Sequence, residues 1–111
     1  MILEIRTYRL KPGTRDDFVR IMLTESVPLL KPFGITVVDA GPSLVDEDGF
    51  EEAFLMRLFD DLEDRDRKET EFYGSDVWRD GPREAIISRI ETYHTIAIEV
   101  SDAVAASLPR R

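Results

Sequence analysis

The segment Ala53–Phe59 constrains the fold most, because its side chains are apolar at nearly every successive position rather than at alternate ones. Turn and helix-capping residues flank it, Asp48-Gly49 on one side and Asp60-Asp61 on the other. Successive side chains of a strand point to opposite faces of a sheet. A strand of this kind therefore needs cover on both faces, and helices on one face leave the other for a second copy of the chain.

The other elements are predicted from hydrophobic periodicity and from proline, glycine and capping residues. In chain order we expect a strand at 2–10, a helix from 14 to about 34, a strand at 35–45, a strand at 50–59, a helix from about 61 to 73, a loop at 74–82, a short helix at 82–88 and a strand at 90–100. This β-α-β-β-α-β order is that of a ferredoxin-like α+β fold, an antiparallel four-stranded sheet with its helices on one face.

A chain of 111 residues makes one domain. We expect that domain over 1–100, followed at 101–111 by a short turn and a tail that frays. The net charge of −8 argues against nucleic acid and anionic membranes as partners. The first residues lack a signal-peptide pattern and no apolar run approaches the roughly 18 residues of a membrane span, so we expect a cytoplasmic protein.

The sequence also excludes several kinds of site. It contains no cysteine and one histidine, so it has neither a thiolate nucleophile nor an H-E-x-x-H zinc motif. Glycine-rich nucleotide motifs and the G-x-S-x-G elbow are absent. Haem would depend on His94 as its one available imidazole ligand. We therefore expect no cofactor and no metal.

The first strand and turn, Ile2–Gly13, run I-L-E-I-R-T-Y-R-L-K-P-G and resemble the opening of NIPSNAP-type proteins. Val27-Pro28-Leu29-Leu30, Phe33-Gly34 and Trp78 fit the same pattern. The resemblance implies a dimeric α/β-barrel, in which two four-stranded sheets face each other across a two-fold axis. Related barrels include cofactor-free quinone-forming monooxygenases, haem-using enzymes and isomerases, so the fold does not fix the chemistry.

His94 is the first candidate for catalysis. It lies in the last predicted strand and, by strict alternation, shares a face with Ile90, Ile96 and Ile98. An imidazole facing a pocket could act as a general base on a phenol or an enolisable carbonyl compound. The alternative is a structural histidine bonded to a side chain or to water.

Glu25 is the second candidate, because a regular helix would place it in one apolar stripe with Phe18 and Met22. A carboxylate there faces a pocket or pairs with a cation such as Arg6. The alternative is that Pro28 disturbs the helix and Glu25 turns outward. We predict that His94 and Glu25 border the same cavity.

The functional hypothesis is a homodimer with one small apolar pocket per protomer, binding an aromatic or acyl-type metabolite. If the protein is a catalyst, His94, Glu25 and Tyr8 carry a cofactor-free oxygenation or isomerisation; the alternative is a non-catalytic ligand-binding or protein-interaction module. Arg6, Phe18, Met22 and Trp78 are the expected pocket-lining residues. The stretch Asp60–Glu71 mixes both signs of charge and is expected to be a surface helix with ion pairs between opposite charges.

Overall fold

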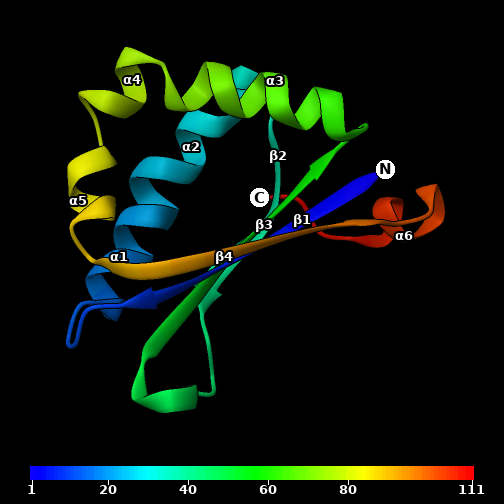
Figure 1. The fold of residues 1–111 in the computed structure, drawn as a ribbon. Helices are drawn as coiled ribbons and strands as arrows, with labels where there is room; N and C mark the ends of the chain where they lie inside the picture. The colour runs from blue at the N-terminus through cyan, green and yellow to red at the C-terminus, as the bar shows by residue number, and fades with distance from the viewer.

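The computed structural model describes all 111 residues and contains one four-stranded antiparallel sheet in the order β2-β3-β1-β4 (Figure 1). The strands are β1 (Ile2–Leu10), β2 (Thr36–Pro42), β3 (Glu51–Phe59) and β4 (Ile90–Glu99). Between β2 and β3 the chain turns at Asp48 and Gly49, both with positive φ, as the Asp-Gly pair predicts. The ferredoxin-like α+β architecture expected from the sequence is confirmed.

The helices α1 to α5 lie over one face of the sheet (Figure 1). The helical segments are α1 (Arg15–Ile21), the π-helical turn η1 (Met22–Ser26), α2 (Val27–Leu30), the 3₁₀ turns η2 (Lys31–Phe33) and η3 (Glu47–Gly49), α3 (Leu62–Tyr73), α4 (Asp76–Arg79), α5 (Arg83–Ile87) and α6 (Asp102–Ser107). The segment 74–82, expected to be a loop, contains the short helix α4, which Ser75 caps by accepting a hydrogen bond from the Trp78 amide. None of the helices has the length and apolar character needed to cross a membrane.

The π turn η1 changes which side of the first helical segment faces the sheet. The backbone N–H of Val27 donates to the carbonyl of Met22, five residues earlier, so the turn holds one residue more than an α-helical turn. As a result Ser26 is buried and Glu25 is exposed. The prediction that Glu25 lies in the inner stripe is wrong because it assumed a regular helix, and the outward alternative is the observed one.

An irregularity in β4 has a similar effect. Leu10 of β1 pairs with Ile90, whereas Arg9 pairs with Thr92, so Glu91 is an extra residue in the strand. Ile90 therefore lies on the helix side, and His94 lies on the opposite side of the sheet, which we call the open face. The prediction that these two residues share a face is wrong, since the bulge reverses the alternation between them.

The hydrophobic core lies between the helices and the sheet. It includes Phe18 and Ile21 from α1, Leu55 and Phe59 from β3, and Phe72 from α3, all less than 5% exposed. Burial of one such side chain stabilises the fold by about 1.5–3 kcal/mol. The core thus fixes α1 and α3 on this face of the sheet.

The end of the chain packs on the open face. Ala105 of α6 is buried against Leu3 and Leu58, whose side chains project from the sheet on the side opposite to α1–α5. The backbone N–H of Arg111 donates to the Val37 carbonyl at 2.8 Å, and its guanidinium lies 2.8 Å from the carboxylate of Asp39. The prediction of a frayed tail is therefore wrong, because these contacts hold the tail on β2.

Candidate functional site

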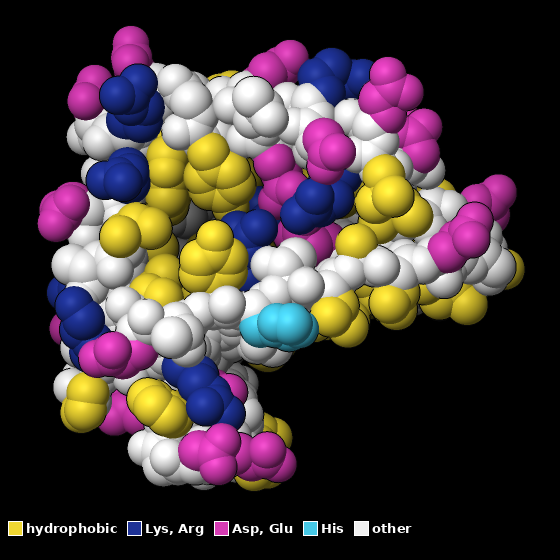
Figure 2. All heavy atoms as spheres, in the orientation of Figure 1, with side chains coloured by type: hydrophobic (Ala, Val, Ile, Leu, Met, Phe, Trp, Pro, Cys, Tyr) yellow, Lys and Arg dark blue, Asp and Glu magenta, His cyan; other side chains and the backbone are white.

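A cavity of about 320 Å³ lies between the helix-covered face of the sheet and the segments η1 to α5. Its size is at the lower end of the range of about 300–1,000 Å³ that is usual for ligand pockets. Figure 2 shows hydrophobic side chains around a hollow above β4, with Lys or Arg side chains beside them. The residues lining this pocket are Arg6, Tyr8, Met22, Ser26, Leu30, Leu55, Phe72, Tyr73, Trp78, Arg83, Ile86, Ile87, Ile90 and Tyr93.

Three aromatic side chains form one wall of the pocket. The ring of Tyr73 lies 5.0 Å from that of Phe72 and 5.4 Å from that of Trp78, and in both pairs the rings meet edge to face. Such pairs add about 0.5–1.5 kcal/mol beyond simple burial. Trp78 reaches this wall because α4, capped by Ser75, turns the chain back after α3. The wall is thus held in place from two helices.

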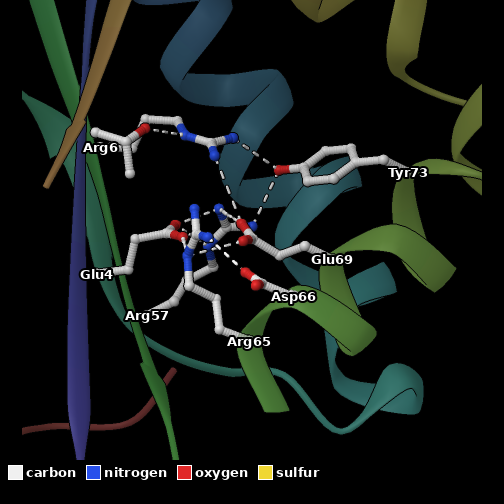
Figure 3. A network of polar contacts seen from close by, with 8 residues as sticks. Glu4, Arg6, Arg57, Arg65, Asp66, Glu69 and Tyr73 are labelled. Atoms are coloured by element: carbon white, nitrogen blue, oxygen red, sulfur yellow. Dashed lines mark hydrogen bonds and ion pairs between the residues drawn. The ribbon is translucent and has the colours of Figure 1, made fainter. Parts of the chain in front are cut away.

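Arg6 is one of the two arginines that line the pocket, the other being Arg83. It projects from β1 toward the hydroxyl of Tyr73 on α3 (Figure 3). Its Nε donates to the Oγ1 of Thr95 at 2.9 Å and one Nη donates to the Tyr73 hydroxyl at 3.1 Å. The guanidinium also lies over the ring of Tyr93, 5.2 Å from its centroid. These contacts fix the position of the guanidinium.

Behind Arg6 lies a buried ionic network, shown in Figure 3. Arg57 of β3 is fully buried and donates to Glu4 of β1, to Glu69 of α3 and, at 3.0 Å, to the Tyr73 hydroxyl. Arg65 adds contacts of 2.6 Å to Glu4 and 3.0 Å to Glu69. Buried charges are costly unless each one is paired and hydrogen-bonded. The network therefore ties α3 to the sheet beneath the pocket.

The two buried carboxyls differ in their pKa shifts. Burial alone would raise the pKa of Glu4, but its contacts with Arg57, together with Arg6 and Arg65, lower it. The pKa of Glu69 is raised, first by burial and then by the neighbouring Glu4 carboxylate, against the pull of Arg57. Burial also raises the pKa of the Tyr8 hydroxyl well above its usual range. Tyr8 is therefore a neutral hydroxyl at physiological pH.

The polar groups of the lining are mostly hydrogen-bond donors. The Tyr73 oxygen accepts from both Arg6 and Arg57, which leaves its own O–H for a further partner. The hydroxyl of Ser26 is buried and has no hydrogen-bond partner. No carboxylate is among the lining residues, so the pocket offers donors and lacks a matching anionic acceptor.

Four of the residues expected at the pocket, Arg6, Tyr8, Met22 and Trp78, line it together. Phe18 does not line it: its ring is buried 5.0 Å from that of Tyr8, as part of the core. The segments that bring the four together are β1, η1 and α4.

His94 and Glu25 lie outside the pocket. His94 is exposed on the open face, in a shallow groove with Thr7, Arg9 and Glu52, and the histidine, cyan in Figure 2, is at the surface. The prediction that it borders one cavity with Glu25 is wrong, because the bulge in β4 and the π turn move the two side chains away from the pocket. No group of three or more His, Asp or Glu side chains is placed to hold a metal ion.

The buried network was missed in the sequence analysis, although the sequence contains a signal for it. Glu4 and Arg6 alternate with Leu3 and Ile5, so they share a face with Tyr8 and Leu10. Charged residues on a covered strand face require buried partners. The ion pairs predicted along Asp60–Glu71 are present. The prediction of a surface helix is wrong for Glu69, which is buried against the charges of the sheet.

No family model matches the chain, and no curated protein matches it. Its fold is shared with several solved structures of NIPSNAP family proteins. It is similar to an uncharacterised NIPSNAP-like domain protein from Burkholderia xenovorans, with a TM-score of 0.77 and 20% identity over 98% of this chain and 91% of that one. It is also similar to a NIPSNAP family protein with unknown function from Agrobacterium tumefaciens, with a TM-score of 0.73 and 24% identity over 91% and 88% of the two chains. A more distant likeness is to an antibiotic biosynthesis monooxygenase, with a TM-score of 0.57 and 11% identity over 91% and 99%.

Proposed function

We propose that this protein binds a small, largely apolar molecule in the pocket above the sheet, and that it does so as a homodimer. The observation that carries the proposal is the pocket itself. An apolar cavity with a few convergent polar groups is the usual form of a small-molecule site, and here Arg6, Tyr8, Ser26 and Tyr73 are those groups. Aromatic and acyl-type metabolites, as expected from the sequence, suit such a lining.

The lining favours binding over acid–base catalysis. The catalytic hypothesis required His94 and a second polar group, Glu25 or Tyr8, to reach one substrate directly or through one water. His94 and Glu25 are both exposed and outside the pocket. Tyr8, the third residue of that hypothesis, does line the pocket, and its raised pKa makes it a hydrogen-bond donor rather than a base. Binding is therefore the function that the geometry supports best.

The dimer is supported by the open face of the sheet. Ile96 and Ile98 of β4 are 46% and 41% exposed there, next to the half-buried Ile5, Phe54 and Met56. Contiguous apolar surface of this kind marks an interaction site. The resemblance to dimeric barrels, in which two sheets face each other, makes a second copy the natural occupant. A stable interface would bury about 1,600 Å² in total.

Trp78 is the only tryptophan of the chain and lines the pocket, so its fluorescence reports pocket occupancy. We expect the uncharged probe phenylnaphthylamine to quench Trp78. Met22→Phe fills part of the cavity and is expected to weaken binding at least tenfold, whereas Val77→Phe, at an exposed position outside the pocket, leaves it unchanged. Failure of the probe to bind, or equal binding to wild type and Met22→Phe, would count against the proposal.

A further inference from the structure

We infer that the ligand of this pocket is a carboxylate, whose charged head binds Arg6 and the Tyr73 hydroxyl while its apolar body lies against Trp78. This inference rests on the proposed function and goes further by naming the ligand's chemical class. It follows from three features of the site: the balance of buried charge, the donors left without partners, and the fixed position of Arg6.

The buried charges beside the pocket do not balance. Three guanidinium groups, those of Arg6, Arg57 and Arg65, face two buried carboxylates, those of Glu4 and Glu69. Asp66 adds a third carboxylate, but its side chain is 69% exposed and contacts only Arg65, on the solvent side. Water screens an exposed charge far more than a buried one. An excess of one positive charge therefore remains at the pocket, in a chain whose net charge is −8.

Arg6 is the guanidinium that still has N–H donors available for a ligand. A guanidinium has five N–H donors. Two of those of Arg6 are used at 2.9 and 3.1 Å, on Thr95 and Tyr73, and its contact with Glu69 is longer, at 3.5 Å. By contrast, Arg57 donates to both carboxylates and to Tyr73. An incoming anion would thus meet its strongest available donors at Arg6.

The neighbouring hydroxyls point to the same ligand chemistry. Tyr73 accepts hydrogen bonds from two cations and can give its own proton to an anion. Ser26, 3% exposed and without a hydrogen-bond partner, is a further donor in the lining. Arg83 is also part of the lining, and its only ion pair, with Glu84, is 4.0 Å long. No lining residue would repel an anion.

A carboxylate fits this site better than a phosphate. A guanidinium can pair with either group through two hydrogen bonds, so the charge decides between them. Arg83 is 48% exposed and its charge is screened by water, so one buried excess positive charge remains. That charge matches the single negative charge of a carboxylate, whereas a phosphate monoester carries more than one at neutral pH. The cavity of about 320 Å³ leaves room for a small apolar body beside that head.

The first experiment compares two probes of nearly equal shape, naphthoate and its uncharged amide, by Trp78 fluorescence with the wild-type protein. We expect naphthoate to bind at least tenfold more tightly. Amide binding as tight as that of the acid would overturn the carboxylate inference and leave the proposed function standing. Tighter binding of naphthyl phosphate would overturn the choice of carboxylate. If phenylnaphthylamine also fails to bind, both proposals fall.

The second experiment asks whether Arg6 and Tyr73 provide the preference. Arg6→Met keeps an unbranched apolar side chain without the charge, and we expect it to weaken naphthoate binding at least tenfold while amide binding stays within about twofold. Arg20→Met, at a 60%-exposed position on α1, is the matched control and leaves both affinities unchanged. Tyr73→Phe keeps the ring, so a loss of naphthoate affinity larger than the loss for the amide is expected even if Arg6→Met does not fold. Unchanged naphthoate binding by either variant would contradict the inference.

Discussion

The two faces of the sheet differ in which side chains they bury and which they expose, and the stability of a single chain does not require this difference. The helix-covered face buries Glu4 and Arg57 completely, while the open face exposes nearly half of Ile96 and Ile98. Burial of ions is unfavourable and exposure of large apolar side chains gains nothing, so neither arrangement is explained by the stability of the monomer alone. This contrast supports the proposed function, in which the covered face binds a ligand and the open face binds a second copy of the chain.

The fixed geometry of the covered face depends on complete pairing. A well-packed apolar cluster would often be as stable as a buried ion pair, but removal of one partner leaves an uncompensated charge. Arg57 hydrogen-bonds to two carboxylates and to the Tyr73 hydroxyl. Removal of any one of these partners should therefore weaken the packing of β1, β3 and α3 against one another. Stability measurements can therefore separate the roles of the two faces.

The largest effect is expected from Glu4→Gln. This change leaves Arg57 buried with less compensating charge and should lower the free energy of unfolding by about 3–5 kcal/mol. Urea denaturation followed by circular dichroism measures it. Asp66→Asn, in the same network but exposed, is the control and should cost less than about 1 kcal/mol. Similar losses for the two variants would show that the burial of Glu4 has no energetic importance.

Substitutions at Leu55 and Met56, neighbours on β3 that point to opposite faces, compare the two faces directly. Leu55 is 2% exposed and faces the helices, so Leu55→Ala should cost about 2–4 kcal/mol at any protein concentration. Met56 is half-buried on the open face, beside the cluster that α6 covers, so Met56→Ala should make stability depend more steeply on protein concentration than in wild type. Denaturation at two concentrations tests both variants, and a Met56→Ala protein that differs from wild type by the same amount at both concentrations would place Met56 outside the dimer interface.

A charge on the open face should separate the protomers without unfolding them. Ile96→Glu places a carboxylate where we propose an apolar interface, and we expect at least a tenfold weaker dimer by sedimentation equilibrium. The unfolding free energy of the monomer should change little, because this side chain is already 46% exposed in the single chain. Val77→Glu, on the exposed side of α4, is the control and should leave association unchanged. Equal association of the two variants would place the interface elsewhere.

The smallest effect concerns the tail on β2. The Arg111 guanidinium lowers the pKa of Asp39 from its ordinary value, mainly by hydrogen bonding. A carboxyl whose pKa is lower in the folded state stabilises the fold above its unfolded pKa, and this stabilisation is lost as pH falls through the folded value. Both side chains are 45% exposed, so the contribution should be below about 1 kcal/mol. Arg111→Ala should reduce the loss of stability between pH 5 and pH 2; an unchanged pH profile would show that the pair contributes nothing.

Much of the fold could be predicted from the sequence because its patterns are local. The alternation in Ile2–Leu10 and the apolar run in β3 each identify a strand, and Asp61 caps α3 by accepting from the Asp64 amide as its position suggests. The two errors in side-chain direction come from one extra residue each, in η1 and in β4. Extra residues of this kind break the regular period on which such predictions depend.

The site was harder to predict because it is assembled from distant parts of the chain. Arg6 and Tyr73 are 67 residues apart, and their contact depends on how α3 crosses the sheet. The pairing of Arg6 with Glu69, rather than with Glu25 as the sequence suggested, depends on the same crossing. The even-numbered charges of β1 were the available signal, and only their partners required the three-dimensional structure.

We propose that one face of the sheet holds a ligand while the other holds a second copy of the chain. Native mass spectrometry with excess naphthoate tests both parts in one spectrum. We predict a species of twice the 12.8 kDa chain mass that carries up to two naphthoate adducts, one for each pocket. A monomer would contradict the role of the open face, and a dimer without adducts would contradict the role of the pocket.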